Sequence, residues 1–137
     1  MPVDALIEDF QFLDDWEDRY RYVIELGKEL APLSPAEHSD ANKVRGCASQ
    51  VWLVTERSEG DDPVLTFRGD SDALIVRGLI AVLLEMFSGR TAREILAVNA
   101  EQVLAGLGLR EHLTSQRSNG LSSMVARIRR DAAAALA

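Results

Sequence analysis

The stretch VWLVTERSEGDDPVLTFR, residues 51–68, decides the fold of this 137-residue chain. Its first five residues are strong strand formers. Residues 58–63 are rich in turn formers, and residues 64–68 alternate apolar and polar side chains. This pattern predicts two antiparallel strands, over 49–56 and 64–68, joined by a turn. Residues 44–46 are a candidate third strand beside them.

Two amphipathic helices are expected before this hairpin. Leu6, Phe10 and Leu13 repeat at helical spacing, and a second apolar stripe runs over residues 16–30. The acidic pair at 14–15 can cap the second helix and complement its dipole.

Helices are also expected after the hairpin. Residues 73–87 are apolar on nearly every face, which predicts a buried helix with Asp70 or Ser71 as its N-cap and Gly89 as its C-cap. Capping signals begin shorter helices at Thr91 and Asn99, and a last helix runs from 114–118 to about 136. The expected architecture is α+β, a single domain over 1–137 with a small antiparallel sheet packed against helices.

Composition narrows the classes of function. The chain has 22 acidic and 15 basic residues and a net charge of −7, which argues against general nucleic-acid binding. Its longest apolar run, 79–84, is far shorter than the roughly 20 residues that span a bilayer. The N-terminus has neither a basic region nor an apolar signal core. We therefore expect a cytoplasmic protein with no membrane partner.

The only cysteine, Cys47, lies in the segment KVRGCASQ. A lone cysteine cannot form an internal disulfide or a Cys-rich metal site. It can pack as a small apolar group, or act as a nucleophile or sulfur carrier. Arg45 could favour its thiolate, Gly46 permits a sharp bend, and Ser49 and Gln50 add polar groups nearby. These residues alone leave packing and reactivity equally open.

Other chemistry lacks support in the sequence. A cysteine hydrolase needs a positioned base. Of the two histidines, His38 lies in the polar segment 36–43 and is expected to be solvated, whereas His112 precedes the last helix and is expected to be structural. Neither a metal-ligand spacing, a phosphate-binding loop nor a dinucleotide fingerprint is present.

Four blocks of the chain resemble the SufE family of sulfur-acceptor proteins. The segment RGCASQVWL, residues 45–53, resembles the active-cysteine motif of that family. WEDRYRYVIELG at 16–27, GDSDALIVRGL at 69–79, and LGL, HLT and RSNGL within 107–121 resemble its other characteristic segments. The blocks occur in the order of the family and cover the chain nearly end to end. The resemblance implies a SufE/IscU-like fold.

The resemblance also implies a function. Cys47 would take persulfide sulfur from a pyridoxal-phosphate (PLP) cysteine desulfurase of the SufS or CsdA type, stimulate that enzyme, and relay the sulfur to iron–sulfur cluster assembly. The chain would bind no cofactor or metal of its own, because PLP belongs to the desulfurase and the three cysteine ligands of IscU-type scaffolds are absent. A monomer that docks transiently is expected. The alternatives are delivery from a Csd-type desulfurase to another sulfur pathway, a stand-alone cysteine enzyme, and an interaction module with a structural Cys47.

Family roles carry over to several positions. Arg117 matches an arginine expected near the cysteine, where it could favour the thiolate, although an exposed helix-end role is equally open. Asp70 and Asp72 match a junction motif, with helix capping expected and influence on the cysteine loop as the alternative. Trp52 is expected in the sheet core, and Cys47 is expected to rest toward an apolar pocket that raises its pKa. The residues that shape its loop are Gly46, Ser49 and Gln50.

Overall fold

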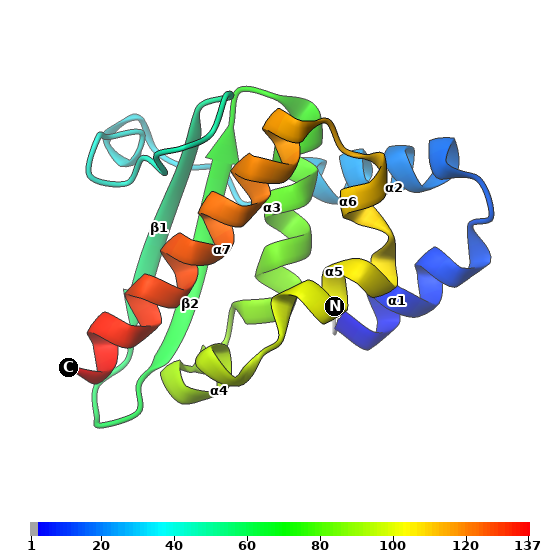
Figure 1. The fold of residues 1–137 in the computed structure, drawn as a ribbon. Coiled ribbons are helices and arrows are strands. Elements are labelled where there is room, and N and C mark those ends of the chain that lie inside the picture. Colours follow the sequence, from blue (N-terminus) through cyan, green and yellow to red (C-terminus); the bar gives the residue numbers. More distant parts are fainter. Residues whose placement is uncertain (1–2) are drawn as a thin grey trace.

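The computed structural model describes residues 3–137, in which a long β-hairpin lies at one side of the molecule and the helices pack against it (Figure 1). The strands are β1 (Val51–Arg57), β2 (Val64–Ser71) and β3 (Arg90–Thr91). The helices are α1 (Val3–Phe12), α2 (Trp16–Lys28), the 3-10 helix η1 (Pro35–Glu37), α3 (Leu74–Phe87), α4 (Ala92–Ala97), α5 (Ala100–Leu107), α6 (Leu109–His112) and α7 (Ser115–Leu136). The predicted α+β architecture is confirmed.

The sheet has three antiparallel strands in the order β1-β2-β3. The hairpin pairs from Val51 opposite Ser71 to Arg57 opposite Leu65. The candidate third strand over 44–46 is wrong, because these residues form no strand and the only bridge nearby is an isolated one between Lys43 and Trp52. The third strand is β3 instead, whose two residues are too few to show the alternation that identifies a strand in a sequence.

One hydrophobic core lies between the hairpin and the helices. Leu53, Leu65 and Phe67 face it from the sheet, and α3 contributes ten buried residues, as its all-round apolar sequence predicted. Helix α2 packs closely against α3: a Cβ placed on Gly78 would lie 2.2 Å from the Val23 carbonyl oxygen. Helix α7 runs beside the hairpin from its open end to its turn (Figure 1). None of the helices in residues 3–137 is both long and apolar enough to cross a membrane.

Most of the predicted helix starts are confirmed. Asp15 accepts from the Glu17 amide at 3.0 Å and caps α2. Thr91 forms the predicted capping box that starts α4, and Asn99 accepts from the Gln102 amide to start α5. The sequence therefore sets these helix starts through contacts two or three residues apart.

The predicted caps of α3 are wrong. Its N-cap is Ala73, which has no side-chain cap, because β2 continues through Asp70 and Ser71. The Ser71 hydroxyl accepts instead from the Ala73 amide, at 3.2 Å, ahead of the helix. The C-cap is Ser88, and Gly89 follows it with a φ of +81°.

Trp52 does not belong to the sheet core. Successive strand residues point to opposite faces, and Val51 and Leu53 point inward, so Trp52 points to the outer face. There it is partly exposed, and its ring lies 4.7 Å from the His38 ring, edge to face. The segment that contains η1 thus covers part of the outer face of the sheet.

Candidate functional site at Cys47

Cys47 lies in the loop that leads into β1, at the end of the sheet where α3 and α7 both begin. It lines a small cavity of about 20 Å³, which holds roughly one water molecule. We call this cavity the cysteine pocket. Its other lining residues are Ala48 and Ser49 of the loop, Val76 and Leu79 of α3, and Gln116, Arg117, Gly120 and Met124 of α7.

The thiol of Cys47 is half-buried against α7. Its Sγ lies 3.6 Å from the Gly120 carbonyl oxygen, to which it can donate a weak hydrogen bond. Burial raises the pKa of the Cys47 thiol above its usual value, because the thiolate is less well solvated there than in water. The folded environment therefore favours the thiol over the thiolate.

Gly46 attaches one side of the loop to α7. Its φ of +88° is in the left-handed region that favours glycine, and a Cβ there would lie 2.6 Å from the Ser123 Oγ. The Ser123 hydroxyl donates to the Gly46 carbonyl oxygen at 3.4 Å. The glycine is thus required both by the backbone conformation and by the close approach to α7.

Asp72 attaches the other side of the loop. Its Oδ1 accepts from the Gln50 amide at 3.0 Å, and its own amide donates to the Gln50 carbonyl oxygen at 3.4 Å. The capping role expected for Asp72 is wrong, and its side chain instead holds the end of the cysteine loop. Gln50 takes part in both hydrogen bonds through its backbone, and the residue is exposed to solvent.

The two candidate arginines lie on different sides of the loop. Arg117 lines the cysteine pocket, whereas Arg45 is exposed and lines a neighbouring groove with α7. Neither side chain forms an ion pair within residues 3–137. The pKa of Cys47 is shifted by burial and not by the charge of either arginine. Tertiary structure thus brings Arg117, 70 positions away in the chain, to the pocket of Cys47.

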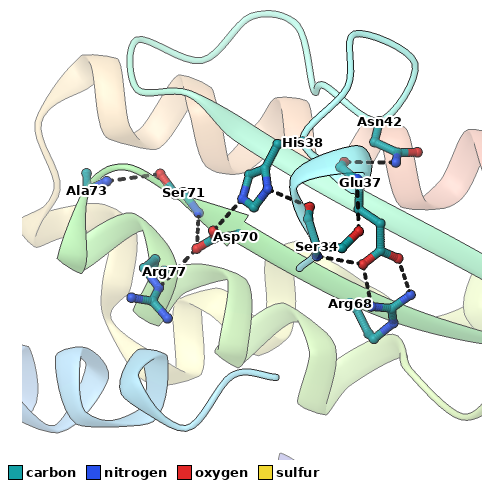
Figure 2. Close-up of polar contacts among 9 residues, drawn as sticks. All are labelled: Ser34, Glu37, His38, Asn42, Arg68, Asp70, Ser71, Ala73 and Arg77. Carbon is teal, nitrogen blue, oxygen red and sulfur yellow. Dashed lines mark hydrogen bonds and ion pairs between the residues drawn. The ribbon is translucent and has the colours of Figure 1, made fainter. Parts of the chain in front are cut away.

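Asp70 belongs to a separate charged cluster on the outer face of the sheet (Figure 2). Its Oδ2 lies 2.8 Å from the His38 Nε2, and its Oδ1 lies 3.2 Å from the Arg77 Nε. The capping role expected for Asp70 is therefore wrong. It does not line the cysteine pocket either. Its contacts with His38 and Arg77 link β2 to the η1 segment and to α3.

His38 is the residue that sequence reasoning missed. It was expected to be solvated, but its Nδ1 lies 2.8 Å from the Ser34 carbonyl oxygen while its Nε2 faces Asp70 (Figure 2). Both partners offer acceptor oxygens, so this arrangement favours the doubly protonated, charged imidazole. The hydrogen bond to Asp70 is the main cause that raises the pKa of His38. No local signal marks this pair, because its members are 32 residues apart.

Arg68 holds the η1 segment against the same outer face (Figure 2). Its guanidinium donates to both carboxylate oxygens of Glu37 and lowers the pKa of Glu37 to about 2. The Ser34 capping box closes the same turn.

The predicted structural role of His112 agrees with its ring, which stacks on the Trp16 ring with 4.2 Å between the ring centroids. Within the described residues, no three His, Cys, Asp or Glu side chains are grouped to hold a metal ion.

Comparisons with known proteins agree with this fold and sequence. A family model of SufE, described as "Fe-S metabolism associated domain", matches residues 4–132. An uncharacterized SufE-like protein of Rhizobium etli is 58% identical over 131 residues, which are 95% of this chain and 88% of that protein. An uncharacterized SufE-like protein of Rhizobium meliloti is 56% identical, over 95% of this chain and 94% of its own.

A solved structure shows the same fold. The solution structure of a hypothetical protein from Thermus thermophilus superposes with a TM-score of 0.77 at 21% identity, and the match covers 98% of this chain and 95% of that one. The family match covers most of the chain, and the two SufE-like relatives are more than half identical to it. The chain therefore belongs to the SufE family, which is associated with iron–sulfur metabolism.

Proposed function

We propose that Cys47 accepts persulfide sulfur from a PLP-dependent cysteine desulfurase and relays it to iron–sulfur cluster assembly. One observation carries the proposal: the only cysteine of a SufE-family chain lies half-buried in a pocket that also contains an arginine without an ion-pair partner in the described residues. Such a pocket suits one sulfur atom held away from solvent. Access and thiolate formation then decide when Cys47 reacts.

The transfer is a thiol–persulfide exchange. The Cys47 thiolate attacks the outer sulfur of the persulfide on the donor cysteine, a new S–S bond forms on Cys47, and the S–S bond on the donor breaks. The donor cysteine leaves as a thiolate, and the transferred sulfur keeps its proton. No external oxidant or reductant is needed. Arg117, which lines the same pocket, would stabilise negative charge on sulfur during this exchange.

The loop must open for this exchange. The cysteine pocket holds about one water molecule, so a donor cysteine cannot enter it while the loop is closed. Loop release would also lower the pKa of the thiol toward its ordinary value, because the desolvation that raises it would be lost. An alkylating reagent should therefore modify Cys47 faster in the presence of the desulfurase. Equal rates with and without it would contradict this step.

The partners follow from the same proposal. The donor is a desulfurase of the SufS type, with a CsdA-type enzyme that feeds another sulfur pathway as the alternative. PLP belongs to the donor, and the SufE-type chain acts as a cytoplasmic monomer over 1–137 without a cofactor of its own. Its role is that of a carrier and activator rather than a stand-alone enzyme.

The test is direct because the chain has a single cysteine. The protein is mixed with a cysteine desulfurase and L-cysteine, and both the mass of the chain and the rate of sulfide release are measured. We expect the mass of one sulfur atom to be gained on Cys47, together with faster sulfide release. Cys47→Ser should lose both. Stimulation retained in Cys47→Ser would instead favour an interaction module in which Cys47 only packs.

A further inference from the structure

A second hollow lies directly beside the cysteine loop. It is open to solvent and has a volume of about 250 Å³. It lies between residues 43–45 and the middle of α7. We call it the basic groove. Its lining residues are Lys43, Val44, Arg45, Ser123, Ala126, Arg127 and Arg130. It shares no lining residue with the cysteine pocket.

The charges of the basic groove are all of one sign. Four of its lining residues are cationic, and neither the groove nor the cysteine pocket is lined by an acidic residue. This is unexpected in a chain with 22 acidic residues and a net charge of −7. Elsewhere, by contrast, Arg68 pairs with Glu37 and Arg110 pairs with Glu101.

Only one cation of the groove has a structural role. Arg127 pairs with Asp131 at 3.3 Å, and its guanidinium donates to the carbonyl oxygens of Lys43 and Ala41. It therefore holds residues 41–43 against α7. The side chains of the other three cations, Lys43, Arg45 and Arg130, form no hydrogen bond or ion pair within the part of the chain that the structure describes.

Three unpaired cations in one groove do not stabilise the fold, because like charges repel each other. They do create a local positive potential, which can orient and accelerate the approach of a negatively charged surface. The groove begins two residues from Cys47, because Arg45 lines it, so a protein docked at the cysteine has these cations within its reach. This charge pattern therefore suits a partner whose surface is acidic.

We propose that the basic groove is the docking site for an acidic surface segment of the persulfide donor. This inference rests on the proposed function. The donor is the partner that meets the unloaded, half-buried thiol, and the groove is already formed in that state. Because residues 43–45 lead directly into the cysteine loop, docking there would also act on the segment that must move to release Cys47.

Charge reversal tests the proposal. Lys43→Glu/Arg130→Glu changes two groove cations that do not line the cysteine pocket. Arg21→Glu/Arg93→Glu is the control. It makes the same change in charge at exposed residues of α2 and α4, which line neither the basic groove nor the cysteine pocket. Desulfurase charged with L-cysteine and freed of excess cysteine is mixed with each full-length protein. Loading of Cys47 is followed by mass at subsaturating donor.

The proposal predicts a loss that depends on salt. At about 0.01 M ionic strength, where the Debye length is about 30 Å, the groove variant should load about tenfold or more slowly than the unmodified protein. At about 1 M, where the Debye length is about 3 Å, the two should differ by less than about twofold. The control variant should stay within about threefold of the unmodified protein throughout. The loading rate at saturating donor should be unchanged in both.

Three results would overturn the proposal: equal losses in the two variants, a loss that high salt does not remove, or normal loading with impaired delivery to an iron–sulfur scaffold. The last would assign the groove to the acceptor. If circular dichroism shows the groove variant unfolded, Lys43→Ala/Arg130→Ala makes the same comparison with a smaller charge change. If the unmodified protein itself gains no sulfur, the proposed function fails as well, whereas normal loading with unaffected variants removes only the groove assignment.

Discussion

The Sγ of Cys47 lies 3.6 Å from the carbonyl oxygen of Gly120, although the two residues are 73 positions apart in the sequence. Gly120 is buried inside α7, and a Cβ built on it would lie 3.5 Å from that Sγ. This is an ordinary van der Waals distance. The cysteine therefore rests against a part of the helix where one methyl group fits and anything larger competes with the thiol.

Gly120→Ala should stabilise the protein and close the pocket further. Replacing a glycine inside a helix by alanine gains roughly 0.5–1 kcal/mol, and the added methyl contacts Sγ without a clash. We expect a higher free energy of unfolding in denaturant titrations and slower alkylation of Cys47. Gly106→Ala in α5 is the control, because nothing lies within 4 Å of a Cβ there. Equal effects of both variants on alkylation would contradict the pocket contact.

Asp72→Ala should free the cysteine loop. The lost hydrogen bond from the Gln50 amide is worth about 0.5–1.5 kcal/mol, which corresponds to up to about a tenfold larger open population. Alkylation of Cys47 should accelerate by a similar factor. Asp72→Asn keeps an acceptor oxygen at this position and should react close to the unmodified rate. Equal rates in the two variants would show that this hydrogen bond does not hold the loop.

Gly46→Ala should destabilise the loop through both conformation and contact. A left-handed conformation costs a non-glycine residue roughly 1–2 kcal/mol, and the new Cβ would also meet the Ser123 Oγ. Gly60→Ala is the matched control, since Gly60 has a φ of +112° but open space around a Cβ. We expect the larger loss of thermal stability at Gly46. Ser123→Ala in the Gly46→Ala background should recover part of the difference.

The pairing of His38 with Asp70 should make stability depend on pH. The pKa of His38 is raised in the folded protein. The stabilisation from this shift is therefore complete below the unfolded pKa of about 6.5 and is lost as pH rises through the folded pKa. A double-mutant cycle with His38→Gln and Asp70→Asn, followed by denaturant unfolding, measures this coupling. The coupling should be largest near pH 6 and should shrink at alkaline pH. A coupling that does not change with pH would exclude a charged His38.

The sequence predicted those features that depend on near neighbours. The hairpin follows from residues 51–68, the buried helix from 73–87, and the capping box at Thr91 from residues three positions apart. The alternation or helical spacing of apolar residues shows which face of a strand or helix is buried. Capping side chains accept hydrogen bonds from the free amides of the first helical turn. The motif around Cys47 and three further blocks identified the family for the same reason, since each of them is a short local segment of the chain.

Only the tertiary structure decided what those elements bring together. Asp70 and Ser71 looked like caps, but strand pairing extends β2 through them and directs Asp70 toward His38. The two-residue third strand forms because Val64 and Leu65 present a free edge to it. The contact of Cys47 with Gly120 likewise joins segments with no shared local pattern. Such contacts depend on how whole elements pack, so the sequence alone determined the family and its candidate reactive residue, and packing decided the buried state of that residue and the charged groove beside it.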